Sequence, residues 1–309
     1  MFFNKDNNGA LELHNLTGIY FASNDFKAIE GELLDAEREV VSIVGTDILS
    51  KAEDAYANGT DEEFVRAVQL PMACLAMQRY FQQTSVSHED AGRKIKAGDD
   101  EKVPFEWMLD RDDRALREKY YRALDALFAY LEKSEMEEWQ NSFVYQNKKR
   151  SIVKDIHTFE SVYPIEQSHY TFFMLLPLIV EVQTTKLKRA LGDAWTRING
   201  EAVADGDAAL LFCARRAAIL NAIVLAVERW SIEVFPQSVA RRFMPTYQGN
   251  RANKSASIEE MEWYLGKLKG QANEAMQDLL SEVAGGNLYA EYPLMPENDR
   301  SKKYFDAGM

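Results

Sequence analysis

The feature that most constrains this chain is an internal repeat of a helix, a glycine and a second helix. Phe26 and Gly45 are separated by the same number of residues as Phe173 and Gly192. The apolar positions between them also correspond: Leu33 with Val180, Val40 with Leu187, Val44 with Leu191 and Ile48 with Trp195. Apolar residues at intervals of three and four predict helices that each bury one face.

After each glycine come a polar turn and a strongly apolar helix that holds one cysteine, Cys74 in the first copy and Cys213 in the second. An ancient duplication of a helix pair explains this layout, and chance sharing of apolar spacing is the alternative. A duplicated pair buries one shared core in a quasi-symmetric body. We therefore expect a mainly α fold of two repeated helical units packed as a bundle, with extended loops and a C-terminal tail.

The helical pattern also indicates where these units begin and end. Residues 1–145 form the expected first unit, 146–286 the second, and 287–309 an extended C-terminal tail. The expected helices are 26–56, 62–84, 111–139, 170–199, 208–235 and 257–284. Prolines predict kinks at Pro71 and Pro177. Between the helices we expect a short helix or turn and an exposed loop over 87–100, a return to the core over 103–108, and short strands or a packed loop over 140–167.

Charge and cysteine content narrow the class of protein. The chain has 309 residues and a formal net charge of −13, with 46% hydrophobic residues, which is typical of a soluble globular protein. The acidic balance argues against a basic nucleic-acid-binding face. Two cysteines within apolar helices indicate buried, reduced thiols in a cytosolic fold. No signal peptide is evident, and the apolar stretch 172–182 is too short to span a bilayer, so we expect no membrane partner.

The sequence holds few groups with the spacing of a catalytic or metal site. Glu166 and His169 have the E-x-x-H spacing of a di-iron helix, but such sites need two of these motifs and this chain has one. The four histidines are scattered, and neither a phosphate-binding glycine loop, a G-x-S-x-G motif nor a C-x-x-C motif is present. We therefore expect no enzyme activity, no cofactor and no metal.

Some residues are better explained by contacts with another chain. The tail is rich in aromatic residues and proline, and ordering it costs entropy unless it docks on its own domain or on a neighbour. The paired arginines inside and after helix 208–235 fit either local pairing with carboxylates or salt bridges between subunits. The predicted interface residues are Tyr289, Tyr292, Tyr304, Phe305, Arg241 and Arg242.

Three segments carry a resemblance to a known family: Thr158 to Phe172, the paired helix–glycine–helix units, and Lys302 to Gly308. Together they resemble a family of phage and prophage structural proteins encoded among head and tail genes. The helical body is similar to the head-to-tail connector proteins, or adaptors, of tailed phages. The resemblance implies a homo-oligomeric ring in the virion neck, made in the host cytoplasm, with the portal protein and a tail or second adaptor protein as partners.

In such a ring, DNA passes through the channel without sequence-specific binding. An acidic wall suits this role, because it repels the phosphate backbone and lets the DNA slide. The alternative is a cytosolic, all-helical interaction or regulatory protein without catalysis, with the groove between the two halves as its partner site. A helical enzyme or metal protein that uses Glu166 and His169 is the third hypothesis.

Overall fold

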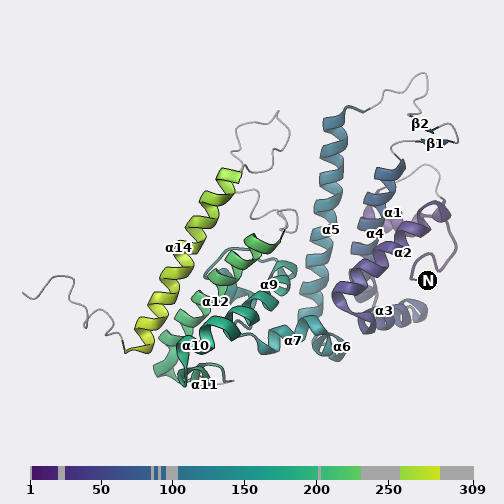
Figure 1. Cartoon of the computed structure of the whole chain (residues 1–309). Helices are drawn as coiled ribbons and strands as arrows, with labels where there is room; N and C mark the ends of the chain where they lie inside the picture. Colours follow the sequence, from purple (N-terminus) through teal and green to yellow (C-terminus); the bar gives the residue numbers. More distant parts are fainter. Residues whose placement is uncertain are drawn as a thin grey trace, which may run out of the picture. The chain divides into compact units, whose positions relative to one another are not determined.

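The computed structural model describes residues 2–19, 25–84, 87–89, 92–94, 104–200, 203–230 and 258–285 (Figure 1). These residues confirm the mainly α fold. They divide into two compact units. Unit 1 comprises Met1–Arg150 and Pro164–Leu176, and unit 2 comprises Ser151–Tyr163, Pro177–Arg229 and the helix Ile258–Val283. The predicted tail 287–309 lies outside the described residues.

Unit 1 is built from helices and one short strand pair. Its elements are α1 Leu11–Thr17, α2 Phe26–Val44, α3 Thr46–Asn58, α4 Glu62–Thr84, β1 Ser87–Glu89, β2 Gly92–Lys94, α5 Glu106–Ser134, α6 Glu137–Asn141 and α7 Phe143–Arg150. The single helix expected over 26–56 is wrong: Gly45, at φ 101°, separates α2 from α3. Of the short helix or turn expected at the start of 87–100, the helix is wrong, because β1 and β2 pair antiparallel there; residues 90–91 and the expected loop at 95–100 lie outside the described residues.

The core of unit 1 forms around α4, which packs against both α2 and α5 (Figure 1). Helix α4 is apolar around much of its circumference and continues through Pro71. The chain start is also part of this core, since Phe2 and Phe3 are buried. The buried amide of Gln69 on α4 donates to the Phe2 carbonyl at 2.7 Å and to the Glu12 carboxylate at 2.9 Å. These bonds satisfy a buried backbone group that has no helix partner.

An aromatic cluster in unit 1 joins α5, α6 and the first half of α9. Trp139 on α6 lies edge-on to Phe128 on α5, with ring centroids 5.4 Å apart. Phe173 lies 5.4 Å from Phe128 and 5.2 Å from Trp139, and Tyr170 lies 5.5 Å from Phe128. Tilted and edge-to-face pairs of this kind stabilise a core beyond their buried area. They place the first half of α9 with unit 1.

Unit 2 is also built from helices, but they are interrupted more often than those of unit 1. Its elements are α8 Ile156–Glu160, the second half of α9 His169–Val182, a π-helical turn Gln183–Leu187, α10 Lys188–Leu191, α11 Ala194–Ile198, a 3-10 turn Asp205–Asp207, α12 Ala208–Arg229 and α14 Ile258–Val283. Of the short strands or packed loop expected over 140–167, the strands are wrong, because α7 and α8 lie there, whereas the buried non-helical residues 151–153 fit the packed loop. The helix expected over 170–199 contains the π-helical turn and is broken at Gly192, at φ 54°.

Helices α12 and α14 form the main packing of unit 2 (Figure 1). They run antiparallel, because Arg216 pairs with Asp278 while Glu228, further along α12, pairs with Lys269, earlier on α14. Arg216 thus pairs with a carboxylate of its own chain, which confirms the interpretation that this arginine pairs locally. Cys74 is buried as predicted, whereas Cys213 is only partly buried, and both are free thiols.

A buried non-helical segment begins unit 2. Ser151, Ile152 and Val153 are buried, so their backbone groups need partners within the protein. The Ile152 N–H donates to the Gln183 amide oxygen at 3.0 Å, and the Ile152 carbonyl accepts from Arg215 Nε at 3.1 Å. The π-helical turn therefore carries the amide that holds this segment in the core.

Candidate functional site

The residues predicted from sequence to form an interface cannot be placed. Tyr289, Tyr292, Tyr304, Phe305, Arg241 and Arg242 all lie outside the described residues. Glu166 is exposed just before α9, and His169 begins that helix. Within the described part of the chain, no group of three or more His, Cys, Asp and Glu side chains could hold a metal ion.

Large apolar side chains lie exposed at the start of α5. Phe105, Trp107, Met108 and Leu109 are all exposed, and Trp107 retains 57% of its accessible surface. The expectation that 103–108 returns to the core is therefore wrong for these residues. On α7, Phe143 retains 79% of its surface.

A second exposed apolar group lies on unit 2. Phe212 near the start of α12, and Leu280 and Val283 near the end of α14, are exposed. Because the two helices are antiparallel, with Arg216 paired to Asp278, these three side chains belong to the same end of the helix pair. Exposed apolar groups that lie together mark interaction surfaces more often than single exposed residues do.

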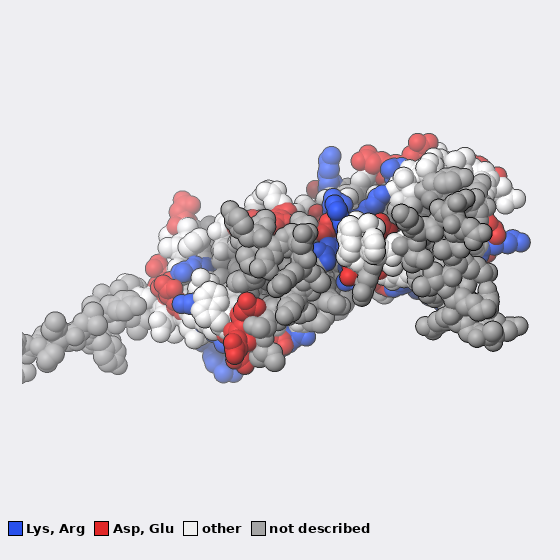
Figure 2. Space-filling model, turned by 90° about the horizontal axis from the view of Figure 1, so that it is seen from above, with Lys and Arg blue, Asp and Glu red and all other residues white. Residues whose placement is uncertain are grey.

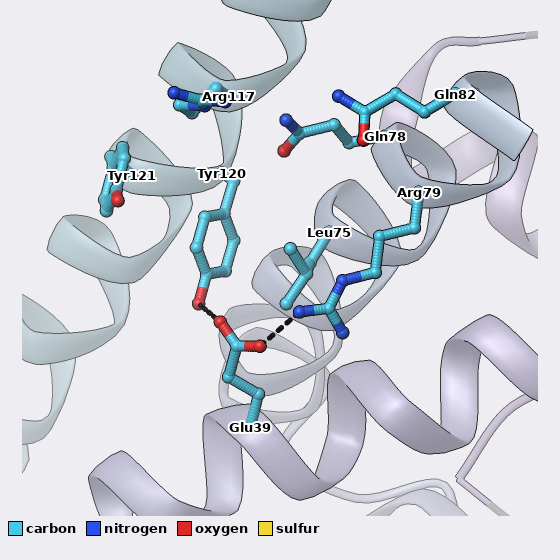
Figure 3. A pocket seen from close by; sticks show the side chains of 8 residues that line it. All are labelled: Glu39, Leu75, Gln78, Arg79, Gln82, Arg117, Tyr120 and Tyr121. Atoms are coloured by element: carbon cyan, nitrogen blue, oxygen red, sulfur yellow. Dashed lines mark hydrogen bonds and ion pairs between the residues drawn. The ribbon is translucent and has the colours of Figure 1, made fainter. Parts of the chain in front are cut away.

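Unit 1 also contains a polar pocket of about 230 Å³ between α2, α4 and α5 (Figure 3). The residues that line it are Glu39, Leu75, Gln78, Arg79, Gln82, Arg117, Tyr120 and Tyr121. Helix α2 contributes Glu39, α4 contributes the next four, and α5 contributes the last three. Three helices that are far apart in the sequence therefore build one site.

The best-defined interactions in the pocket centre on Glu39. Its Oε2 pairs with Arg79, and its Oε1 accepts a hydrogen bond from the Tyr120 hydroxyl at 3.4 Å (Figure 3). Burial raises the pKa of Tyr120 well above its ordinary value, and the negative charge of Glu39 raises it further. Tyr120 is therefore a neutral donor at ordinary pH, and it holds the carboxylate in place together with Arg79.

Other donors in the pocket are not used. Gln78 is only 6% exposed, yet its amide makes no hydrogen bond with a described residue, and Figure 3 shows it directed from α4 toward α5. Arg117, on the facing helix, likewise has no ion pair with a described residue. Buried polar groups are nearly always hydrogen-bonded in folded proteins. The amide atoms of Gln78 are open to the pocket and not sealed from solvent, so water there can satisfy them.

Sequence reasoning missed these residues because they carry no motif. One signal was present: Gln78 and Arg79 follow one another in a helix that is otherwise largely apolar at its centre. The charged residues of α5 have the spacing of a solvated helix face, which fits the exposure of Arg117. The sequence does not indicate that this face closes over Gln78.

One described helix is long and apolar enough to cross a membrane by length and composition. It is Asp205–Arg229, in which an 18-residue window has a mean hydropathy of 1.9 and is 56% buried in the protein. The core helix of a soluble protein passes the same test, so this helix is weak evidence for a membrane.

No protein family model, curated protein or solved structure matches this chain.

Proposed function

We propose that this chain is a structural protein of a phage neck. In this proposal it is a head-to-tail connector, or adaptor, that forms an oligomeric ring between portal and tail and lines the DNA channel. It acts by assembly and not by catalysis. The resemblance of residues 158–172 and 302–308 to phage structural proteins gives the specific class, and the surface of the helices gives the physical support.

The supporting observation is the exposure of large apolar side chains on both units. Phe105, Trp107, Met108 and Leu109 lie close in sequence at the start of α5, and Phe212, Leu280 and Val283 lie at the same end of the α12–α14 pair. Tryptophan, phenylalanine and methionine are enriched in protein interfaces, where they supply most of the binding energy. A chain that assembles with copies of itself would bury such side chains in the ring.

The charge distribution suits a wall past which DNA moves. The whole chain carries a formal net charge of −13. On the face drawn in Figure 2, acidic and basic side chains are interspersed, and neither sign alone covers the part of it that is described. Tight DNA binding requires clustered Lys and Arg that neutralise several phosphates. A mixed surface on an acidic protein favours passage of DNA over its retention.

Molecular mass in solution tests this proposal. We expect the full chain to form rings visible by electron microscopy, alone or with the portal protein encoded beside it. A Trp107→Glu variant should keep its helical circular dichroism and lose ring formation. The matched control is Leu34→Glu, which places the same charge at an exposed leucine on α2. A chain that stays monomeric with the portal protein present contradicts the proposal, as does a gene neighbourhood without portal, capsid and tail genes.

A second candidate is a cytosolic, all-helical interaction or regulatory protein without catalysis. The observation that favours it is the polar pocket of unit 1, where Gln78 and Arg117 keep unused donors. Such a protein would bind its ligand as a monomer or small oligomer. Mass measurement separates the two candidates, because only the neck protein needs a ring.

A further inference from the structure

The first described residues of unit 1 form a strap, residues 2–5, that contacts three helices. Phe2 and Phe3 are both buried. The ring of Phe2 lies edge-on to that of Tyr56 on α3, with centroids 5.7 Å apart. The Phe2 carbonyl accepts a hydrogen bond from the buried Gln69 amide of α4 at 2.7 Å. The strap is therefore seated by both apolar and polar contacts.

The surface that receives the strap is a slot made by Glu12 of α1, Tyr56 and Ala57 of α3, and Gln69 of α4. The Lys5 N–H donates to the Tyr56 hydroxyl at 2.8 Å, and Lys5 Nζ donates to the carbonyls of Tyr56 at 3.0 Å and Ala57 at 2.8 Å. These carbonyls lie in the last turn of α3, where a cation is favourable. Gln69 and the Tyr56 hydroxyl each donate to the Glu12 carboxylate at 2.9 Å. The slot thus recognises two phenylalanines followed by a lysine.

Side chains, and not a helix or a sheet, hold the strap in the slot. The hydrogen bonds that tie its backbone to the helices go to the side chains of Gln69, Glu12 and Tyr56. The strap can therefore leave the slot without breaking a helix. Every copy of the chain carries the same slot, so a strap that moves to another copy regains the same contacts there.

The turn between the strap and α1 favours such an exchange. Asn4 has φ 59°, Asn7 has φ 51° and Gly9 has φ 72°. Residues other than glycine adopt this left-handed conformation at a cost in free energy. The turn directs the strap back onto its own slot, whereas a strap that reaches another copy does not need it. Strain in a short hinge is a known cause of exchange of identical segments between copies.

We propose that the slot of unit 1 accepts residues 2–5 of a second copy of this chain, so that exchange of the strap joins the copies. Reciprocal exchange closes a dimer, and head-to-tail exchange closes a ring. The proposal does not depend on a role in a phage neck, which rests on the resemblance and on exposed side chains elsewhere in the chain.

Fluorescence anisotropy with a labelled peptide of residues 2–9 tests whether the slot accepts a strap from outside. The receptor is the full chain with Phe2→Ala and Phe3→Ala, which empties its own slot. We expect the peptide to bind one site per chain, and to bind the parent at least about tenfold more weakly, because the attached strap competes at high effective concentration. Adding Gln69→Leu to the receptor should weaken binding by about fivefold or more.

The matched control is the same peptide with both phenylalanines replaced by alanine, which should not bind. Equal binding of the two peptides overturns the proposal, as does the absence of binding to a receptor that keeps its helical circular dichroism. Trp107→Glu, the variant that tests the neck proposal, should leave peptide binding to the receptor unchanged, so the two proposals fail separately.

Sedimentation equilibrium of the full chain tests the hinge with the strap itself unaltered. Asn7→Gly relieves the left-handed conformation and should weaken self-association by about fivefold or more, whereas Asn7→Val should strengthen it. Asn8→Gly and Asn8→Val are the controls, because Asn8 is exposed and has no positive φ. Equal effects at the two positions overturn the proposal. A parent chain that stays monomeric together with its Asn7→Val variant also overturns it.

Discussion

Among the described residues, units 1 and 2 share a series of helices in the same order but use their polar residues differently. In each, a buried non-helical segment leads to a short helix, a helix that ends at a glycine with positive φ, a short helix, an apolar helix and a long amphipathic helix. In unit 1 these are residues 2–3, α1, α2, α3, α4 and α5, and in unit 2 residues 151–153, α8, α9 to α10, α11, α12 and α14. The predicted duplication fits this order and stays a prediction.

The difference between the units shows which polar groups have a structural role. In unit 2, the Gln183 amide oxygen accepts a hydrogen bond from the Ile152 N–H, and Arg215 donates one to the Ile152 carbonyl. In unit 1, Gln69 does the same for Phe2, whereas Gln78 and Arg117 keep their donors unused. A polar side chain that hydrogen-bonds a buried backbone group has a structural role. Arg117 is exposed and the Gln78 amide is open to its pocket, so water can satisfy both groups.

The largest expected effect tests whether the two units unfold separately. Leu127 on α5 and Leu279 on α14 are both fully buried. Replacing either by alanine leaves a cavity, and we expect each change to lower the free energy of unfolding by about 2–5 kcal/mol. In calorimetry, Leu127→Ala should move only the transition of unit 1, and Leu279→Ala only that of unit 2. Two variants that shift one common transition would show that the units unfold together.

The second prediction concerns alkaline pH and unit 1. Burial raises the pKa of Tyr170 to about 12, and Tyr121 and Glu39 add to this. In the unfolded chain a tyrosine ionises near pH 10, so above that pH the unfolded state binds fewer protons and stability falls. This contribution, on the order of 2–3 kcal/mol, is fully present below about pH 10 and is lost by about pH 12.

Tyr170→Phe removes the titrating group and keeps the ring. Urea unfolding between pH 9 and pH 12 should show a smaller loss of stability in this variant than in the parent protein. An identical pH profile for the two proteins would show that Tyr170 ionises in the folded state as easily as in the unfolded state.

The third prediction tests the structural role of the π-helical turn in unit 2. Gln183→Leu keeps most of the side-chain volume but leaves the Ile152 N–H without its acceptor. An unsatisfied buried backbone group costs about 1–3 kcal/mol. The matched change in unit 1 is Gln69→Leu, which removes the donor to Phe2. Hydrogen exchange should increase at Ile152 in the first variant, and protection there that does not change would argue against this role.

The smallest expected effect concerns the two glycines that define the repeat. Gly45 has φ 101° and ψ 156°, and Gly192 has φ 54° and ψ −127°, conformations that L side chains rarely adopt. No atom lies within 4 Å of an added Cβ at either position, so the cost is backbone strain alone. Strain of about 1–3 kcal/mol, partly offset by lower entropy of the unfolded chain, gives a net loss of about 1–2 kcal/mol.

Gly31 provides the control for these variants. It lies within α2 with open space around its Cβ position. Gly31→Ala should therefore stabilise the protein by about 0.5–1 kcal/mol, because alanine is the better helix former. Gly45→Ala and Gly192→Ala should lower the denaturant midpoint, whereas Gly31→Ala should raise it. A shared direction would show that the glycines do not act through their backbone conformation.

The sequence predicted well where the signal is local. Helix α4 begins and ends as the apolar pattern predicts, and Gly285 ends α14 with φ 74°, as the glycine pair after the helix indicates. The sequence predicted poorly where two kinds of secondary structure fit the local pattern of apolar residues equally well. The segment 140–167 holds too few apolar residues in any one period to distinguish short helices from strands, and only the structure shows Ile156 and Phe159 buried on the short helix α8.

The sequence by itself determined the helical class and the repeated glycine stops, because the spacing of apolar residues fixes which face of a helix is buried. Only the tertiary structure decided which helix covers that face. It brings Glu39, Arg79 and Tyr120 together from three helices, leaves Gln78 without a partner in a pocket, and exposes Trp107 where its apolar character predicts burial. The physical reason is that periodicity acts within one element, whereas a site depends on distances between elements.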